Sequence, residues 1–318
     1  MQNNIQLLKP RDLGQVIRDS FGFLKLTFKP FSTVLLLGVL PFILLGGYLY
    51  SSFIFNTLSN LPGLNEGYVT RTPSGLVSRV LPAVLALMLG TVVLYLASIE
   101  TFFKYEKSET GTITSADIFD GIKSDLLRFI SFIILAILIS VLSLIVISIA
   151  MGLLVSLASM ASTVVGGILG IVFFCGFIYL GLAFIFTPVI FLRERCDLIT
   201  AFSRSFLLIK GHWWQTFGIL FVMYIVIYLM MLVLALPFYI FVFASAFSGI
   251  KTGNALPQIG NWGAVYLTFL FCFTTLVSSV FHNAVMLQYY SLTEQKYGEN
   301  VMQRIQNMNQ LDSESFKA

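Results

Sequence analysis

Residues 197–217 read DLITAFSRSFLLIKGHWWQTF, a helix with a polar face inside a chain that is 57% hydrophobic. An aspartate opens the stretch, and apolar residues follow at Leu198, Phe202, Phe206 and Ile209. Steps of four, four and three residues place these side chains on one side of a helix. The aspartate is a natural N-cap, and its charge suits the positive end of the helix dipole. The stretch therefore predicts an amphipathic helix lying along a membrane surface.

The rest of the chain has the composition of a membrane protein. Only 11% of its residues are charged, where a soluble domain has about 25%. Residues 31–55 and 129–192 contain no charged residue, and about twenty apolar residues suffice to span a bilayer. A soluble fold would leave much of this apolar surface exposed. We therefore expect an all-α integral membrane protein.

Six apolar segments predict six transmembrane helices in a single domain, residues 1–300, followed by a polar cytoplasmic tail, 301–318. The predicted spans are 31–55, 77–102, 127–156, 163–190, 215–246 and 263–289. The first thirty residues contain no apolar core of a cleavable signal peptide, so we expect the first span to act as the insertion signal.

Lys and Arg are distributed unevenly about these spans. Of the nineteen, sixteen fall on the side of the two termini, and only Arg71, Arg79 and Lys251 fall on the other. The positive-inside rule then places both termini in the cytoplasm. We expect a multi-pass protein of the bacterial inner membrane whose basic residues meet anionic lipids at the cytoplasmic face. No nucleic-acid partner is expected.

The opening stretch is one of three similar copies, which begin at Asp12, Asp117 and Asp197 and precede spans one, three and five. Apolar residues recur at equal offsets: Leu13, Ile17, Phe21 and Leu24; Ile118, Ile122, Leu126 and Phe129; and the four named above. The predicted fold is therefore three degenerate units, each an interfacial amphipathic helix plus a transmembrane hairpin.

The third copy supplies the candidate interaction residues, which are Arg204, Lys210, His212, Trp213 and Trp214. Basic and aromatic residues at a membrane interface most often anchor a protein in the headgroup layer. The alternative interpretation is a docking surface for a cytoplasmic or membrane protein partner.

Span six contains two polar residues, His282 and Asn283. An ionisable group inside a membrane is a functional candidate by default, but a neutral histidine can also hydrogen-bond a neighbouring helix. No carboxylate stands in the middle of a span, and Glu100 is expected to reach the interface, so a structural role is favoured. In span four, Gly166 and Gly170 have the GxxxG spacing that predicts close helix packing.

No motif in the chain indicates catalysis. HExxH, GxSxG and Walker phosphate loops are absent from the sequence. Cys175, Cys196 and Cys272 have neither metal-binding nor disulfide spacing. We therefore predict no catalytic, cofactor-binding or metal-binding residue, and a protein that is not an enzyme.

Three stretches carry a resemblance to a known family: RDLGQVIRDSFGFLKLTFKPF (11–31), DLITAFSRSFLLIKGHWWQTFGIL (197–220) and YYSLTEQKYGENVMQRI (289–305). They resemble the membrane domain attached to some bacterial glycerophosphodiester phosphodiesterases, and related six-span bacterial membrane proteins. In that family the hydrolase activity belongs to a separate soluble domain with metal-binding carboxylates and histidines. The resemblance implies a fold and a location, and no catalytic residue can be carried over.

The first functional hypothesis is a non-enzymatic scaffold or accessory subunit of a membrane complex. The alternative is a permease subunit for a small molecule or lipid, with the 197–210 helix docking a cytoplasmic ATPase. The permease signature, with its Glu-Ala-Ala start and fixed glycine, is not matched by DLITAFSRSF. A third hypothesis, an intramembrane enzyme, has no visible acid–base pair to support it.

The charge distribution makes a topology prediction. In a cysteine-free background, Gly63→Cys and Thr252→Cys should react with a membrane-impermeant thiol reagent added from outside the cell, because both positions lie on the side with few Lys and Arg. Labelling of both positions only from the cytoplasmic side would contradict the orientation.

Overall fold

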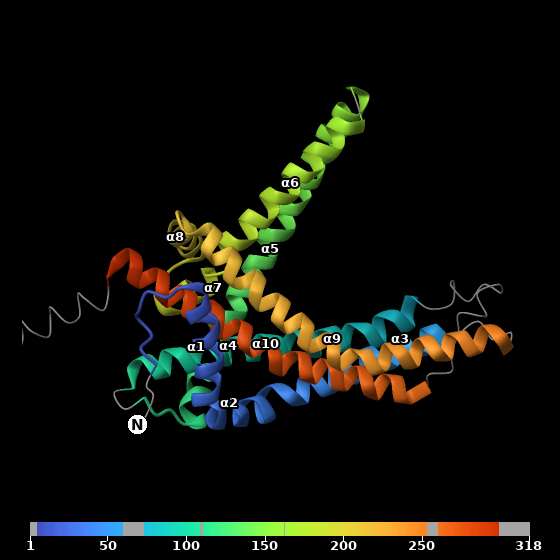
Figure 1. Ribbon diagram of the computed structural model, residues 1–318, viewed down its shortest axis with the longest axis horizontal. Helices are drawn as coiled ribbons and strands as arrows, with labels where there is room; N and C mark the ends of the chain where they lie inside the picture. Colours follow the sequence, from blue (N-terminus) through green and yellow to red (C-terminus); the bar gives the residue numbers. More distant parts are fainter. Residues whose placement is uncertain (1–4, 60–72, 109–110, 162, 253–259, 299–318) are drawn as a thin grey trace, which may run out of the picture. The chain divides into compact units, whose positions relative to one another are not determined.

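The structure is a computed structural model that describes residues 5–59, 73–108, 111–161, 163–252 and 260–298. Within these residues the regular secondary structure is entirely helical (Figure 1). In chain order the elements are α1 (Leu13–Leu26), α2 (Phe28–Val34), the π-helix η1 (Leu35–Val39), α3 (Leu40–Ser59), α4 (Pro73–Lys107), α5 (Ser115–Ala161), α6 (Thr163–Phe184), α7 (Thr187–Arg193), α8 (Leu198–Ile209), α9 (Trp213–Thr252) and α10 (Gly260–Tyr297). The predicted all-α fold is confirmed.

Six segments of the described chain are long and apolar enough to cross a membrane. They are Phe28–Ile54, Val80–Lys107, Ser115–Ile149, Gly167–Arg193, Trp213–Ala244 and Trp262–Tyr297. Each overlaps one predicted span, and the protein is a polytopic membrane protein. The predicted tail, 301–318, and the labelling position Gly63 lie outside the described residues.

The three copies of the amphipathic segment join their spans in different ways. In the third copy α8 ends at Ile209, and Gly211 then adopts a φ of +91°, a conformation that glycine tolerates and that stops a helix. In the first copy α1 ends at Leu26 and α2 begins at Phe28. In the second copy there is no break, and the amphipathic segment and the span are one helix, α5.

The most deeply buried residues of the amphipathic segments lie on the predicted face in the second copy, partly on it in the third, and beside it in the first. The second copy buries Ile118, Ile122 and Phe129 as predicted. In α1 the buried stripe is instead rotated by about one residue, to Val16, Ser20 and Phe23, while Leu13 and Phe21 are partly exposed. In α8 the buried residues are Ala201, Ser205 and Leu208 together with Ile209 of the predicted face. Ser20 and Ser205 are fully buried on these sides, where small residues allow a close approach of backbones.

Span four is interrupted. α6 ends at Phe184, and α7 starts at Thr187 with Pro188 in its first turn, where the missing N–H of proline costs no hydrogen bond. The close packing predicted for Gly170 is not made within the described chain, because a Cβ there would meet no atom within 4 Å.

By its internal contacts the chain divides into two compact units, and α1, α5, α9 and α10 each contribute to both. Unit 1 consists of Met1–Ile17, Lys123–Leu220 and Val285–Ala318, and unit 2 of Arg18–Ile122 and Phe221–Ala284.

In unit 2 the helices α3 and α4 pack through glycines. A Cβ on Gly46 would lie 2.8 Å from the carbonyl oxygen of Ala83, and one on Gly90 would lie 2.6 Å from Cδ1 of Ile43. Because neither position has room for a methyl group, these glycines set the distance between the two helices. Phe23 of α1 stacks on Phe102 of α4 with ring centroids 3.9 Å apart, which joins the amphipathic helix to the same unit.

The glycine packing of unit 2 gives a stability prediction. Gly46→Ala should lower the free energy of unfolding by about 1–3 kcal/mol, the usual cost of overpacking a filled interior. The matched control is Gly152→Ala in α5, where a Cβ meets no atom within 4 Å; its gain in helix propensity should leave stability unchanged or raised by up to about 1 kcal/mol. Thermal unfolding in detergent measures both, and equal loss in the two variants would contradict the packing argument.

Candidate functional site

The predicted interaction helix, α8, begins at a well-formed N-cap. The carboxylate of Asp197 accepts hydrogen bonds from the Thr200 hydroxyl at 2.7 Å and from the Thr200 backbone N–H at 3.3 Å. These bonds hold the pKa of Asp197 below its usual value, because they favour the charged carboxylate. The N-cap of α8 is therefore Asp197, as the sequence predicted.

The inner face of α8, formed by Ala201, Phe202, Ser205, Phe206 and Leu208, packs on the protein itself. The Ser205 hydroxyl donates to the carbonyl of Ala183 in α6. Phe202 stacks on Phe184 with ring centroids 4.0 Å apart, and Phe206 meets Tyr179 edge-on at 6.2 Å. The aromatic side chains expected to face the bilayer or the helix bundle thus face the bundle.

The outer face of α8 comprises Ile199, Arg204, Leu207 and Lys210, and all four are exposed. Ile199 is 75% exposed. Arg204 forms an ion pair with Glu194, so its charge is already matched within the chain. The outer face thus combines two apolar residues with one paired and one further basic residue.

The structure divides the five predicted interaction residues into two groups. Arg204, Lys210 and Trp214 face outward, and Trp214 is 77% exposed. Trp213 instead stacks between Tyr179 and Phe217, at centroid distances of 5.7 Å and 5.3 Å. Nδ1 of His212 lies 3.4 Å from Oε1 of Gln215.

Two basic residues connect the segments of this site by hydrogen bonds. From the sequence they were counted only as cytoplasmic charges. Lys296 of α10 donates from Nζ to the carbonyl oxygens of Leu207 and Lys210, the latter at 2.8 Å. The last carbonyls of α8 have no partner within the helix. A lysine from far along the chain therefore caps the C-terminal end of α8.

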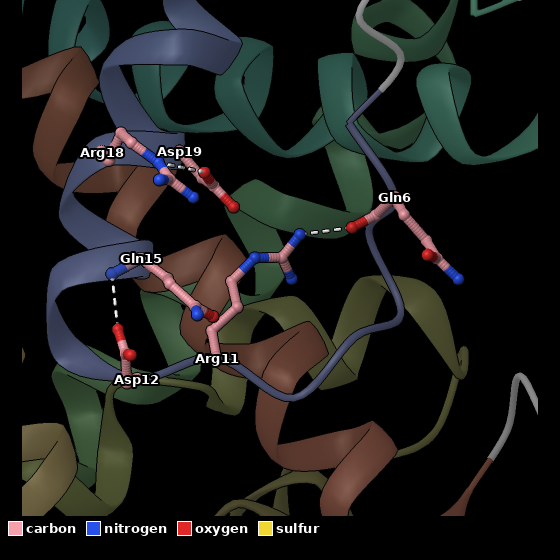
Figure 2. A network of polar contacts seen from close by, with 6 residues as sticks. All are labelled: Gln6, Arg11, Asp12, Gln15, Arg18 and Asp19. Atoms are coloured by element: carbon pink, nitrogen blue, oxygen red, sulfur yellow. Dashed lines mark hydrogen bonds and ion pairs between the residues drawn. The ribbon is translucent and has the colours of Figure 1, made fainter.

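Arg11 is the second of these residues, and it is buried. Its guanidinium donates to the carbonyls of Leu7 at 2.7 Å, of Lys9 at 3.2 Å and of Gln6. Figure 2 shows this side chain turned back on its own segment toward Gln6. No local pattern in the sequence distinguishes it from the other arginines.

The backbone of Arg11 joins the same segment to two helices. Its N–H donates to the Ser291 hydroxyl of α10 at 2.9 Å, and its carbonyl accepts from Nε2 of Gln215 in α9 at 3.1 Å. Nearby, the N–H of Gln15 donates to the Asp12 carboxylate at 2.7 Å, as Figure 2 shows, so the N-terminal copy also begins at an aspartate cap. The N-terminal segment is thus fixed beside the start of α9.

The polar residues of span six lie in unit 2. The ring of His282 meets the Tyr95 ring of α4 at right angles, with centroids 4.9 Å apart. Its Nδ1 is buried and has no hydrogen-bond partner among the described residues, and Asn283 is buried beside it. The structure brings no carboxylate to this histidine within the contacts described for unit 2.

The structure encloses Glu100 within the protein, near the C-terminal end of α4. Its residue is only 4% exposed, and its carboxylate occupies the space that a Cβ on Gly121 of α5 would need. Glycine at position 121 therefore allows a carboxylate to be enclosed between α4 and α5. Sequence reasoning missed this because a glutamate so close to Lys104 and Lys107 is usually solvated.

Within the described residues, no group of three or more His, Cys, Asp or Glu side chains is arranged to hold a metal ion. Comparison with models of known protein families, with curated proteins and with solved structures finds no match to this chain. The function is therefore argued from the geometry of the site.

The surroundings of His282 predict a structural role. His282→Gln should keep the protein folded and abundant, and should retain the phenotype of the unmodified gene, because the ring packs on Tyr95 and Nδ1 makes no described hydrogen bond. Complementation of a deletion strain, with abundance checked by immunoblot, tests this. Loss of complementation at normal abundance would show that the imidazole itself acts.

Proposed function

We propose that the protein is a non-enzymatic scaffold or accessory subunit of a membrane complex, and that it holds a cytoplasmic protein partner on the outer face of α8. The observation that supports this is the division of α8 into two differently used faces. Its inner face is filled by α6 and α7, while Ile199 and Leu207 on the outer face remain exposed.

An anchoring role would use the large apolar side chains of α8 in the bilayer. Phe202 and Phe206 are already used against Phe184 and Tyr179 of α6. The helix is thus held by the protein, and the exposed Ile199, Leu207 and Trp214 are not needed to hold it. A partner with an apolar groove bordered by carboxylates fits such a surface, because Lys210 adds positive charge at its edge.

The permease hypothesis uses the same surface. α8 lies between two membrane spans, is fixed on its inner face and exposed on its outer face, which is the arrangement a coupling helix needs to contact an ATPase. The identity of the co-purified partner distinguishes the two hypotheses. The resemblance to the membrane domain of glycerophosphodiester phosphodiesterases agrees with either, since it implies an architecture and a location.

The two faces of α8 predict opposite mutational effects. Phe202→Glu should sharply reduce the amount of folded protein, because burying a Phe contributes about 1.5–3 kcal/mol and the ring stacks on Phe184. Arg204→Gln plus Lys210→Gln should leave the protein inserted and monodisperse, because an exposed ion pair contributes about 1 kcal/mol or less. Fluorescence-detected size-exclusion chromatography measures both.

The outer-face variants then test docking. Ile199→Ser plus Leu207→Ser, and separately the Arg204 and Lys210 double variant, should fail to co-purify a cytoplasmic protein that the unmodified chain retains. The matched control is Ser203→Ala, an exposed position of α8 that loses only a hydroxyl. If both double variants keep every partner and complement a deletion, the outer face is only a membrane anchor and the docking proposal fails.

A further inference from the structure

The guanidinium of Arg128, in α5, is held in place without a carboxylate partner in the described part of the chain. Its Nη2 donates to the carbonyl oxygen of Cys196 at 3.3 Å, and its central carbon lies 4.9 Å from the centroid of the Phe191 ring. A guanidinium has five N–H donors, and the contacts within the described chain use one of them. Arg128 is thus a partly buried cation in a fixed position that can still donate to a ligand.

The carboxylates that stand near this guanidinium in the chain have other partners. Asp125, one turn earlier in α5, lies 3.4 Å from Nη2 of Arg195. Glu194 forms an ion pair with Arg204, and Asp197 is the N-cap of α8. Among the residues that the structure describes, these contacts leave one positive charge of the junction between α5 and α7 unmatched. An anionic group from outside the chain would complete the site.

Arg195 adds a second guanidinium at the same junction. It follows α7 with a φ of +51°, in the left-handed region where glycine is the usual residue after a helix. An L residue in this region costs free energy, and the conformation accompanies a side chain that reaches Asp125 on α5. The side chain of Arg195 is 67% exposed, so it can contact Asp125 and a ligand together. The two arginines thus meet α5 one helical turn apart.

An exposed apolar path starts at Arg128 and runs along α5. At 3.6 residues per turn, Leu135 and Ile139 lie within about 20° of Arg128 around the helix. They are 43% and 39% exposed, and Leu142 continues the path at 64%. Ile139 is about 17 Å from Arg128 along the helix axis, and one leaflet of the hydrocarbon core is about 15 Å deep. A cation therefore stands at one end of an apolar path as long as one leaflet.

A phospholipid has the two chemistries of this site in the same order. The planar fork of arginine binds phosphate oxygens in pairs, and an acyl chain covers apolar side chains below the phosphate. A headgroup that also carries an ammonium would need a carboxylate, and both Asp125 and Glu194 already have arginine partners. A carboxylate of a protein partner would match the charge but would leave the apolar path below it uncovered. The chemistry therefore favours an anionic phospholipid.

We propose that the junction between α5 and α7 binds the phosphate of one anionic phospholipid. Arg128 donates to the phosphate oxygens, Arg195 adds a second positive charge, and one acyl chain lies along Leu135 and Ile139. The ring of Phe191 and the carbonyl of Cys196 fix the guanidinium before the lipid arrives. The site uses none of the outer-face residues of α8, so the inference does not depend on the proposed function.

Loss of the guanidinium tests the site. Arg128→Gln should weaken binding of phosphatidylglycerol about tenfold or more, because charged hydrogen bonds to phosphate are the strong ones. Arg128→Lys should weaken it less, since lysine keeps the charge and loses the planar fork. The matched control is Arg18→Gln, which removes one positive charge from an exposed arginine paired with Asp19 and should leave binding unchanged. Native mass spectrometry of the purified protein, titrated with the lipid, gives the dissociation constants.

Three probes separate a lipid from a free anion. The unmodified protein should bind phosphatidylglycerol more tightly than phosphatidylcholine, because the choline cation offsets the phosphate charge. Inorganic phosphate should not displace the lipid, because it has no acyl chain to cover Leu135 and Ile139. A ligand that binds the folded state raises the unfolding temperature by mass action, so thermal unfolding with each probe gives a second measure. Thermal unfolding without lipid checks the fold of each variant.

A matched pair of cysteines tests the path of the acyl chain. In a background with Cys175, Cys196 and Cys272 replaced by serine, Leu135→Cys lies on the side of Arg128 and Ile137→Cys on the opposite side. The two positions are 43% and 46% exposed. A bimane label at position 135 should be quenched more than one at 137 by phosphatidylglycerol with brominated acyl chains, present as a minor component of phosphatidylcholine vesicles. Adding Arg128→Gln should remove the difference.

The outcomes separate the ligands. Lipid binding that falls in Arg128→Gln and persists in Arg18→Gln, with stronger quenching at position 135, supports the proposal. Equal losses in the two variants, or equal quenching at the two positions, overturns it in favour of lipid that only surrounds the protein. Inorganic phosphate bound as tightly as the lipid overturns it in favour of a free-anion site. A protein released by Arg128→Gln while lipid binding is unchanged overturns it in favour of a protein carboxylate. If Arg128→Gln fails to fold, Arg128→Lys and the cysteine pair decide by the same criteria.

Discussion

Close approach of helix backbones at small residues is the interaction on which the rest of this structure depends. In the apolar part of a membrane each backbone hydrogen bond must be satisfied within the helix, and no hydrophobic force draws one helix to another. What remains is van der Waals contact, which increases steeply as backbones approach. Gly46 and Gly90 allow that approach between α3 and α4, and Ser205 allows it between α8 and α6.

The polar contacts of the chain satisfy backbone groups at the helix ends. The last carbonyls of a helix and the first amides of the next have no partner within their own helix. Asp197 satisfies the start of α8 locally, whereas Lys296 reaches its end from α10. Arg11 serves the carbonyls of its own segment and links that segment to α9 through Gln215. Basic residues near a membrane surface are thus used here as backbone donors as well as charges.

This distinction explains what the sequence could predict. The number of spans and the all-α fold follow from long apolar runs, and the structure confirms both. The N-cap at Asp197 follows from a local sequence pattern, and the structure shows it. The full extent of the buried side of α1 and α8 was not predictable from apolar periodicity, because Ser20 and Ser205 count as polar although both are fully buried. Hydropathy reflects the free energy of transferring a side chain from water to lipid, whereas helix packing within lipid depends on the size of the side chain.

The candidate site likewise has some features that the sequence predicts and others that it does not. Arg204 and Lys210 could be chosen from sequence as interfacial cations, but the ion pair of Arg204 with Glu194 depends on the turn between α7 and α8. Trp213 and Trp214 are neighbours with the same side chain, yet one stacks between Tyr179 and Phe217 and the other is exposed. Such differences arise from the direction in which the first residues of a helix point their side chains, and the amino-acid composition does not determine this direction.

α6 connects the two surfaces that the chain leaves open. Its C-terminal end, at Tyr179 and Phe184, receives the inner face of α8, whereas a Cβ on Gly167 or Gly170 would meet no atom of the described residues within 4 Å. The aromatic contacts of Tyr179 with Phe206 and of Phe184 with Phe202 therefore decide which side of α8 is turned outward. A docking surface on a scaffold requires one fixed orientation, and the packing of the inner face of α8 on α6 is the interaction within this chain that favours one.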